Sequence, residues 1–271
     1  MFREANFPET FMGSKKIGLA LSGGGARGFA HVGVLKALTE NNIPIDVIAG
    51  TSAGSIVGAA FAAGMSADEV MKMASRVRWG NMVRPSLSPL GVLSNAPMGR
   101  FITQELPVSK FEEMPIPFAA VACDFATGDE VVFKHKGDLA FAIRASCAVP
   151  GVFAPLRQPD GRLLVDGGVI SPTPIEALWG LGADVVIAVD LVACGATFRA
   201  EPRSAFGMMF QSAMMLLRTA SINQHYRADL VIVPQIAHLR PDQINKRDEF
   251  VALGHAAASE SIAGIRKLVD R

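Results

Sequence analysis

The sequence predicts an α/β fold in which a mostly parallel central sheet is flanked by helices. Short apolar runs alternate with longer segments of helical periodicity along the 271 residues. The run Val185–Leu191 is almost entirely apolar, which is typical of a strand buried on both faces of a parallel sheet. Half of the residues are hydrophobic and 19% are charged, so the chain can bury a large core.

The first quarter of the chain has the alternation of a doubly wound sheet. Lys16–Leu21 predicts a strand, and a helix is expected over Phe29–Glu40, where apolar residues recur on one side. Ile45–Ala49 predicts the second strand, and a helix rich in small residues follows it. Ala67–Arg76 predicts a further helix.

The alternation continues to the end of the chain. Strands are expected at Pro117–Asp124, Glu130–Lys134, Leu163–Val165, Val185–Leu191 and Leu230–Val233. Helices are expected at Asp138–Ser146, Ser204–Arg227 and Asp248–Val269. We expect residues 1–15 to form an N-terminal tail and residues 16–271 to form a single domain.

The segment 79–117 interrupts this pattern with prolines at positions 85, 89, 97, 107, 115 and 117. It leaves room for one helix, around Pro97–Leu106. The segment is interpreted either as a lid-like loop or as an ordinary surface excursion that covers the sheet.

Charge and cysteine content exclude several classes of function. The formal net charge is +1 and no long Lys/Arg run is present, so nucleic acid is not an expected partner. Cys123, Cys147 and Cys194 are widely spaced, which predicts free thiols in a reducing compartment and no zinc site. No metal or cofactor is expected. The tail lacks the apolar stretch of a secretory signal, which favours a cytoplasmic protein, with peripheral membrane contact left open.

The pentapeptide Gly50-Thr51-Ser52-Ala53-Gly54 is a G-x-S-x-G pattern between an apolar run and a run of small residues. A strand, a sharp turn and a helix in this order hold the serine hydroxyl out at the turn as a nucleophile. A glycine-rich turn without chemistry gives the same pattern. Other residues have to decide between the two interpretations.

A glycine-rich turn, Gly23–Gly28, follows the first predicted strand and opens a helix. A dinucleotide site is disfavoured because its acidic residue belongs at the end of the second strand, whereas Asp46 stands at the start. A phosphate-binding P-loop is excluded because no Gly-Lys-Ser or Gly-Lys-Thr follows. The carboxyl ends of neighbouring parallel strands face one crevice, so the turn can offer amides to an oxyanion near Ser52. The candidate oxyanion-hole residues are Gly23, Gly24, Gly25 and Gly28, with Gly24 and Gly25 foremost.

Asp166-Gly167-Gly168 supplies a candidate base at the end of a predicted strand. Asp-Gly-Gly is most often a turn, and it supports a catalytic role only in combination with the other two motifs. Without a histidine, the carboxylate itself has to accept the serine proton, pass it to the departing alcohol and then activate water. Such an aspartate would benefit from a raised pKa.

The ordered set Gly23–Gly28, Gly50–Ser55 and Asp166–Gly168 resembles the patatin-like phospholipase family, most closely its bacterial neuropathy-target-esterase-type members. The resemblance covers roughly Lys16–Pro234 and includes the stretch Ala145–Phe153. It implies a three-layer α/β/α fold and a Ser-Asp dyad that works through an acyl-enzyme. It also implies that the glycine turn is the oxyanion hole and that acyl lipids are the substrate class.

Two other functions stay open at this point. The first is an α/β-hydrolase with a Ser-Asp-His triad, which chain position disfavours because only two strands precede the serine. Its members would come from Ser52, Asp166, Asp190, His225, His238 and His255. The second is a non-catalytic regulatory or scaffold protein that keeps the fold without the activity.

Several residues are expected to support the site or to contact partners. The supporting residues are Gly50, Gly54, Gly167, Gly168 and Arg27. Arg27 either contacts a phosphate-bearing headgroup or pairs with a carboxylate that braces the glycine turn, and the bracing role is favoured. The Met-rich residues 206–217 are expected to fill the core. If exposed, they would form a homo-oligomer contact or a membrane-surface patch.

Overall fold

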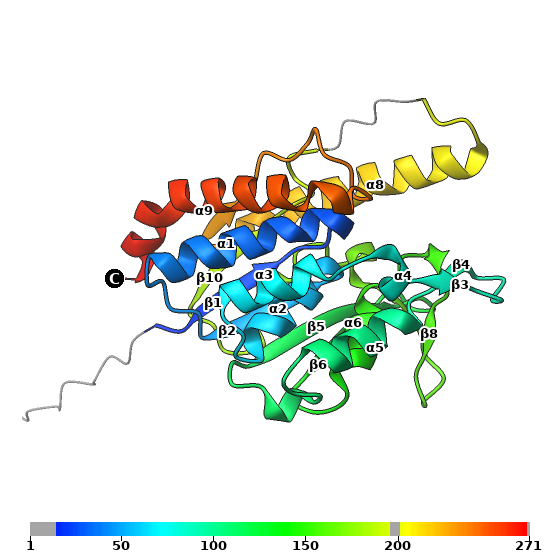
Figure 1. Ribbon diagram of the computed structural model, residues 1–271, viewed down its shortest axis with the longest axis horizontal. Helices are drawn as coiled ribbons and strands as arrows, with labels where there is room; N and C mark the ends of the chain where they lie inside the picture. The colour runs from blue at the N-terminus through cyan, green and yellow to red at the C-terminus, as the bar shows by residue number, and fades with distance from the viewer. Residues whose placement is uncertain (1–14, 196–200, 270–271) are drawn as a thin grey trace, which may run out of the picture.

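The computed structural model describes residues 15–195 and 201–269, and its main feature is a sheet covered by helices (Figure 1). The strands of this sheet are β1 (Ile17–Leu21), β2 (Val47–Thr51), β5 (Phe118–Asp124), β6 (Glu130–Lys134), β8 (Leu156–Arg157), β9 (Leu163–Asp166), β10 (Val185–Val189) and β11 (Leu230–Ile232). A smaller sheet contains β3 (Arg84–Pro85), β4 (Gly91–Ser94) and β7 (Gly151–Phe153). The α-helices are α1 (Phe29–Glu40), α2 (Ala53–Ala62), α3 (Ala67–Ser75), α4 (Trp79–Met82), α5 (Ala96–Glu105), α6 (Leu139–Ser146), α7 (Ile175–Trp179), α8 (Ala205–Gln224) and α9 (Arg247–Val269).

The main sheet has a parallel core and an antiparallel margin. Its strands follow the order β11-β10-β1-β2-β5-β9-β8, and β6 also pairs with β5. The strands from β11 to β5 run parallel to one another, whereas β6, β8 and β9 pair antiparallel. The predicted α/β class with a mostly parallel sheet is therefore confirmed.

The register of β5 brings the ends of two other strands together. Val121 pairs with Thr51 of β2 and with Val132 of β6. The next residue, Ala122, pairs with Asp166 of β9 and also with β6. A strand has only two edges, so β2 and β9 share the edge that β6 leaves open. Their carboxyl ends meet there, because Thr51 and Asp166 stand at consecutive positions along β5.

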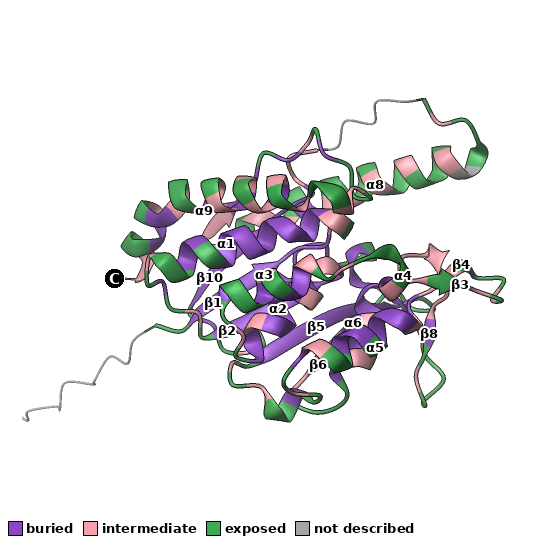
Figure 2. Cartoon of the chain, viewed as in Figure 1, coloured by how far each residue is buried: buried purple, intermediate pink, exposed green. Residues whose placement is uncertain are grey.

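Alternating side chains of the central strands supply two separate cores. Leu19 of β1 belongs to the larger cluster, which packs with α1, α2 and α9. Its neighbour Ala20 belongs to the cluster on the other side, which packs with α7. The central strands are buried throughout (Figure 2). This gives the three layers that the sequence predicts.

Several element boundaries differ from the sequence-based prediction. The second strand was expected at Ile45–Ala49 but begins at Val47, and just before it the Asp46 carboxylate accepts the Ile17 amide (2.7 Å). It then continues to Thr51, since pairing with β5 extends that far. The strand expected to end at Val165 includes Asp166, and the short helix α7 was not predicted.

The segment 79–117 contains more regular structure than its prolines suggest. The expected helix at Pro97–Leu106 is present as α5, shifted by one residue. Strand β4 pairs with β3 and, in parallel, with β7, which ties the excursion to the residues before β9. The lid-like motion and the division into a tail and a single domain stay predictions. Residues 1–14 of that tail lie outside the described residues.

The expectation that the Met-rich residues 206–217 fill the core is wrong for most of the side chains that the structure describes. Met209 and Leu216 are each 72% exposed, and Met208 and Met215 are also exposed. The cause is the place of α8, which lies along the outside of the molecule (Figure 1). Among the described residues, none of the helices combines the length and the apolar character needed to cross a membrane.

Candidate active site

Ser52 occupies a strained turn between β2 and α2. Its backbone has φ 51° and ψ −123°, a conformation that costs free energy for a residue with a Cβ. Its amide donates to Ser146 Oγ (2.8 Å), and its carbonyl accepts from the amide and the hydroxyl of Ser55 (2.8 and 2.6 Å). Ser52 itself is 9% exposed. These bonds fix the serine at the end of the strand, as a nucleophile elbow requires.

The glycines of the elbow allow close packing against β1. A Cβ on Gly54 would lie 2.1 Å from the Leu21 carbonyl oxygen, and a Cβ on Gly50 would lie 2.5 Å from the Gly54 oxygen. Both distances are far below van der Waals contact, so a side chain at either position would displace the turn. The predicted supporting role of Gly50 and Gly54 thus has a steric basis.

Asp166 ends β9 and caps the 3₁₀ turn Gly167–Val169. Its Oδ1 accepts the Gly168 amide (2.7 Å), and its own amide donates to the Ala148 carbonyl (2.9 Å). A Cβ on Gly167 would lie 2.2 Å from the Val121 oxygen, so only glycine lets the chain leave β9 here. The Oδ2 atom is buried and has no hydrogen-bond partner among the described residues.

Burial raises the pKa of Asp166 to about 6, while the Ser52 side chain and the Gly168 amide act in the opposite direction. The Ser52 side chain is thus close enough to the carboxylate to lower its pKa. The approach falls short of a hydrogen bond of normal geometry, because Oδ2 remains unpartnered. In structures without a bound substrate, such catalytic contacts are often loose.

The glycine turn Gly23–Gly28 lies directly beside the serine elbow. A Cβ on Gly28 would lie 2.6 Å from the Ala53 Cβ. The Gly23 amide already donates to the Pro172 carbonyl (3.0 Å). The amides of Gly24 and Gly25 have no hydrogen-bond partner in the described part of the chain. These two amides are therefore the ones available to a ligand.

Arg27 braces this turn, but through backbone carbonyls and not through the carboxylate that the sequence led us to expect. Its Nε and Nη2 donate to the Leu239 oxygen (3.1 and 3.0 Å), and its Nη1 donates to Leu191 and Gly195 (3.2 and 3.0 Å). The residue is 2% exposed. A guanidinium with five donors can satisfy several converging carbonyls at once, which explains the preference. Contact with a headgroup is ruled out by this burial.

Two residues at the end of α6 were missed as parts of the site. Ser146 Oγ accepts the Ser52 amide and donates to the Val121 carbonyl (2.6 Å). The buried Cys147 thiol lies 3.9 Å from Ser55 Oγ, and its pKa is raised by burial and by the charge of Asp166. The family resemblance pointed to the stretch Ala145–Phe153 but gave its members no role.

The histidines do not form a triad with Ser52. None of the five, at positions 31, 135, 225, 238 and 255, makes a hydrogen bond to this serine. His225 contacts Asp190 (2.8 Å), but the serine hydroxyl on that carboxylate belongs to Ser221. His31 is buried, and burial lowers its pKa to about 4. Its Nε2–H donates to the Ser22 carbonyl (2.8 Å).

The fold and the site together define a three-layer α/β protein with a serine elbow beside a buried carboxylate. The family model described as "Patatin-like phospholipase" matches residues 19–179, more than half of the chain. The chain belongs to the patatin-like phospholipase family, as its three motifs indicated.

The curated relatives are longer proteins. An uncharacterized NTE family protein of Mycobacterium tuberculosis is 42% identical over 181 residues, which are 66% of this chain and 49% of that protein. Patatin-like phospholipase domain-containing protein 6 of Homo sapiens is 35% identical over 184 residues, which are 65% of this chain and 13% of that protein. The chain thus spans about half the length of the first of these relatives, and less of the second.

Solved structures share the fold at low sequence identity. VipD from Legionella pneumophila has a TM-score of 0.56 and 15% identity, with 93% of this chain and 67% of that chain covered. The type III effector protein ExoU has a TM-score of 0.52 and 15% identity, with 93% and 53% covered. At this identity the likeness shows the architecture alone.

Proposed function

We propose that the protein hydrolyses acyl esters of lipids, with Ser52 as the nucleophile and Asp166 as its base. The observation that carries the proposal is the buried, unpartnered Oδ2 of Asp166 beside the Ser52 hydroxyl. A buried acceptor without a partner is costly, and catalytic groups are a recurrent reason for one.

Acylation uses the groups already in place. Asp166 takes the Ser52 proton as Oγ attacks the ester carbonyl, and the resulting oxyanion accepts hydrogen bonds from the amides of Gly24 and Gly25. The tetrahedral intermediate then collapses to the acyl-enzyme. The C–O bond to the alcohol breaks, and the departing oxygen takes the proton from Asp166.

Deacylation reverses these roles with water in place of the alcohol. Asp166 accepts a proton from water, which attacks the acyl carbonyl through a second oxyanion. Collapse releases the fatty acid and returns the proton to Ser52 Oγ. A pKa of about 6 suits both steps, because the carboxylate is mostly ionised at neutral pH yet more basic than an exposed aspartate.

A lipid is the favoured substrate because apolar side chains surround the exit from Asp166. Val169 and Ile170 follow the glycine pair and are exposed, Val169 by 51%. Leu217 of α8 lies near Gly168, and several Met and Leu side chains of α8 are exposed. Such a surface fits acyl chains and peripheral contact with a membrane. The names of the family and of the relatives agree with this substrate class.

The experiment is a panel of phospholipids, lysophospholipids, acylglycerols and simple esters. Wild type, Ser52→Ala and the surface control Ser75→Ala are compared. We expect Ser52→Ala to lose all hydrolysis and Ser75→Ala to retain it. Hydrolysis that persists in Ser52→Ala would place the chemistry elsewhere, and a wild type inactive on the whole panel would favour a scaffold.

A further inference from the structure

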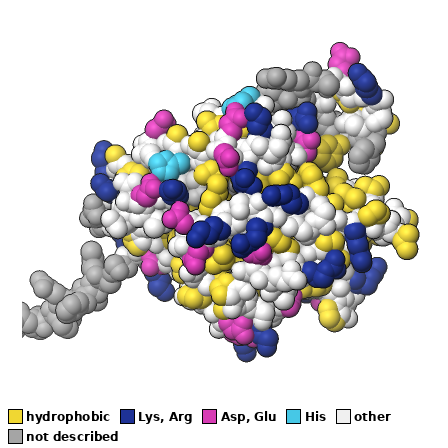
Figure 3. All heavy atoms as spheres, in the orientation of Figure 1, with side chains coloured by type: hydrophobic (Ala, Val, Ile, Leu, Met, Phe, Trp, Pro, Cys, Tyr) yellow, Lys and Arg dark blue, Asp and Glu magenta, His cyan; other side chains and the backbone are white. Residues whose placement is uncertain are grey.

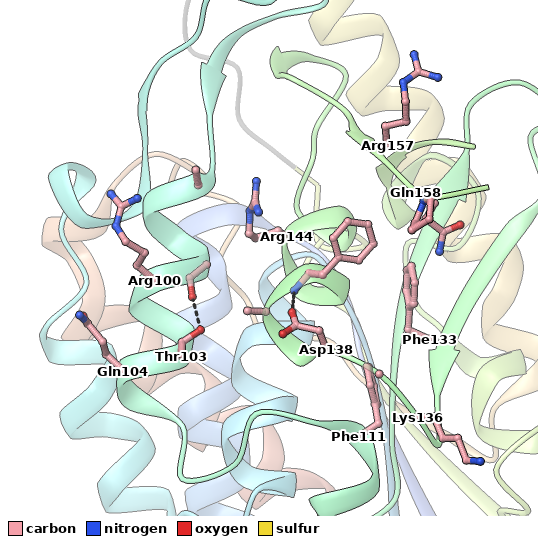
Figure 4. Close-up of a pocket in the computed structure, with 16 residues that line it drawn as sticks. Arg100, Thr103, Gln104, Phe111, Phe133, Lys136, Asp138, Arg144, Arg157 and Gln158 are labelled. Atoms are coloured by element: carbon pink, nitrogen blue, oxygen red, sulfur yellow. Dashed lines mark hydrogen bonds between the residues drawn. The ribbon is translucent and has the colours of Figure 1, made fainter. Parts of the chain in front are cut away.

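An open groove of about 1250 Å³ lies between α5, α6, β6 and β8 (Figure 4). Neither Ser52 nor Asp166 lines it. Its walls combine cationic and aromatic side chains, which come mainly from these four elements and the loops beside them. The proposed hydrolysis makes no use of this groove.

Four cations line the groove, and none of them forms an ion pair within residues 15–195 and 201–269. They are Arg100, Lys136, Arg144 and Arg157. In Figure 4, the guanidinium group of Arg144 lies between those of Arg100 and Arg157, which stand apart on either side of it. Elsewhere on this protein, arginines such as Arg76 and Arg227 pair with carboxylates. The groove wall therefore carries four cations against one carboxylate, that of Asp138.

Arg144 is the innermost of these cations. It is half-buried, its Nε donates to Asn95 Oδ1 (3.2 Å), and its other nitrogens have no partner in the described part of the chain. Burial lowers its pKa, the charge of Asp138 raises it, and the charge of Arg84 lowers it. The one carboxylate on the groove wall, Asp138, has its Oδ1 engaged by the Phe141 amide (2.5 Å). A half-buried guanidinium with unpartnered nitrogens is stabilised when an anion binds to it.

The sequence around the groove extends the positive field. Residues 70–104 contain five Lys or Arg residues and no Asp or Glu, and one of the five, Arg76, pairs with Glu105 just beyond the stretch. This stretch includes α4, the β3–β4 hairpin and all of α5 except Glu105, and α5 forms one wall of the groove. Figure 3 shows Lys and Arg side chains gathered on this part of the visible face. An anionic ligand is therefore attracted before contact as well as held after it.

The remaining lining side chains offer an apolar surface and a hydrogen-bond acceptor to a ligand. The rings of Phe111, Phe133 and Phe141 offer an apolar surface, on which Phe133 and Phe141 meet edge to face. The Oε1 atom of Gln158 is buried and has no hydrogen-bond partner among the described residues. A buried acceptor of this kind calls for a ligand that carries a donor.

We propose that the groove binds a phosphate ester that carries a hydroxyl group, such as a glycerophosphate. The phosphate binds the forked donors of Arg144, and Arg100 and Arg157 on either side add positive charge. The hydroxyl donates to Gln158 Oε1, and an attached apolar chain runs along the phenylalanine rings. Two sources share this chemistry, the headgroup of an anionic membrane lipid and a soluble phosphate ester.

The test measures binding in a Ser52→Ala background, so that no ligand is consumed and the result does not depend on hydrolysis. The groove variant is Arg100→Gln/Arg157→Gln, which leaves the bond between Arg144 and Asn95 in place. The matched control is Arg266→Gln/Lys267→Gln, two exposed cations on α9. The probes are glycerol 3-phosphate, inorganic phosphate, and phosphatidylcholine vesicles with or without phosphatidylglycerol. Circular dichroism and urea denaturation of both double variants check that their fold is intact.

We expect the groove variant to bind its ligand roughly thirtyfold more weakly, the effect of losing two basic contacts to an anionic surface, with the control unchanged. Weakened binding to phosphatidylglycerol vesicles alone identifies the membrane headgroup, and weakened binding to glycerol 3-phosphate alone identifies the soluble ester. Failure of the wild-type groove to bind any anionic probe, or equal losses in groove and control variants, would overturn the proposal.

The role of Gln158 is tested separately with Gln158→Leu, which keeps the approximate volume and removes the acceptor. We expect this variant to lose affinity for glycerol 3-phosphate and to bind inorganic phosphate as before. Equal effects on the two ligands would contradict the assigned hydroxyl contact. Because the parent carries Ser52→Ala, a protein that proved inactive on every ester would leave this result intact.

Discussion

The backbone amide of Ser52 donates a hydrogen bond to Ser146 Oγ at 2.8 Å, although 94 residues separate them in the chain. The same hydroxyl donates to the Val121 carbonyl at 2.6 Å, so one side chain joins the serine elbow, α6 and β5. This junction lies next to the point where β2 and β9 meet end to end. The position of Ser52 therefore depends on a residue that takes no part in the proposed reaction.

Replacing Ser146 by alanine leaves the Ser52 amide buried without an acceptor. We expect the free energy of unfolding to fall by about 1–3 kcal/mol and hydrolysis to fall with it. Urea denaturation and ester hydrolysis measure the two effects. Ser75→Ala, which removes an exposed hydroxyl bonded to the Lys72 carbonyl, is the control. A Ser146→Ala protein as stable and as active as this control would contradict the assigned role.

The pKa of Asp166 sets the pH dependence of the proposed reaction. The base has to be ionised, so kcat/KM is expected to fall as the pH decreases through about 6. If the base had the pKa of an ordinary aspartate, activity would be retained as the pH decreases to near 4. A rate profile on a soluble neutral ester separates these cases, provided that circular dichroism shows the fold unchanged over the range. A profile flat between pH 5 and 8 would argue against Asp166 as the base.

The same pKa predicts the stability of Asp166→Asn. Burial raises the folded-state pKa above the unfolded-state value, so the folded protein binds the extra proton between pH 4 and 6. The stabilisation is complete below pH 4 and is lost as the pH rises through 6. Asparagine avoids burying the charge, and we expect this variant to be more stable than wild type at pH 8, by roughly 2–3 kcal/mol. Equal stabilities at pH 8, measured by urea denaturation, would show that the carboxylate is better solvated than its burial implies.

Arg27 is predicted to hold the glycine turn Gly23–Gly28 in place through its forked geometry. Lysine keeps the charge but cannot reach the carbonyls of Leu191, Gly195 and Leu239 together. We expect Arg27→Lys to lower the free energy of unfolding by at least about 2 kcal/mol, since buried carbonyls lose their donors. The comparison is Arg76→Lys, at an exposed ion pair with Glu105, where the change is expected to be under about 1 kcal/mol. Similar losses in both variants would refute the bracing role.

The fold class and the three motifs were predictable because each follows from local sequence. The turn at Ser52 and the glycine turn at Gly23–Gly28 both require particular residues at fixed spacings. The bracing of Ser52 by Ser146 was not predictable, since it joins distant segments and serine alone gives no signal. Arg27 was assigned the right role with the wrong partners, because the backbone carbonyls of distant loops leave no trace in the sequence. The exposure of α8 was missed because a Met-rich helix has the same pattern in a core and on a surface.

The central claim is that Asp166 activates Ser52 for attack. The most direct test compares the rate at which a fluorophosphonate labels wild type and Asp166→Asn, with the labelled residue mapped by peptide mass spectrometry. We expect the label on Ser52 in wild type and a rate at least about 100-fold lower in Asp166→Asn, the effect of losing a general base. Equal labelling rates, or a label on another residue, would contradict the account.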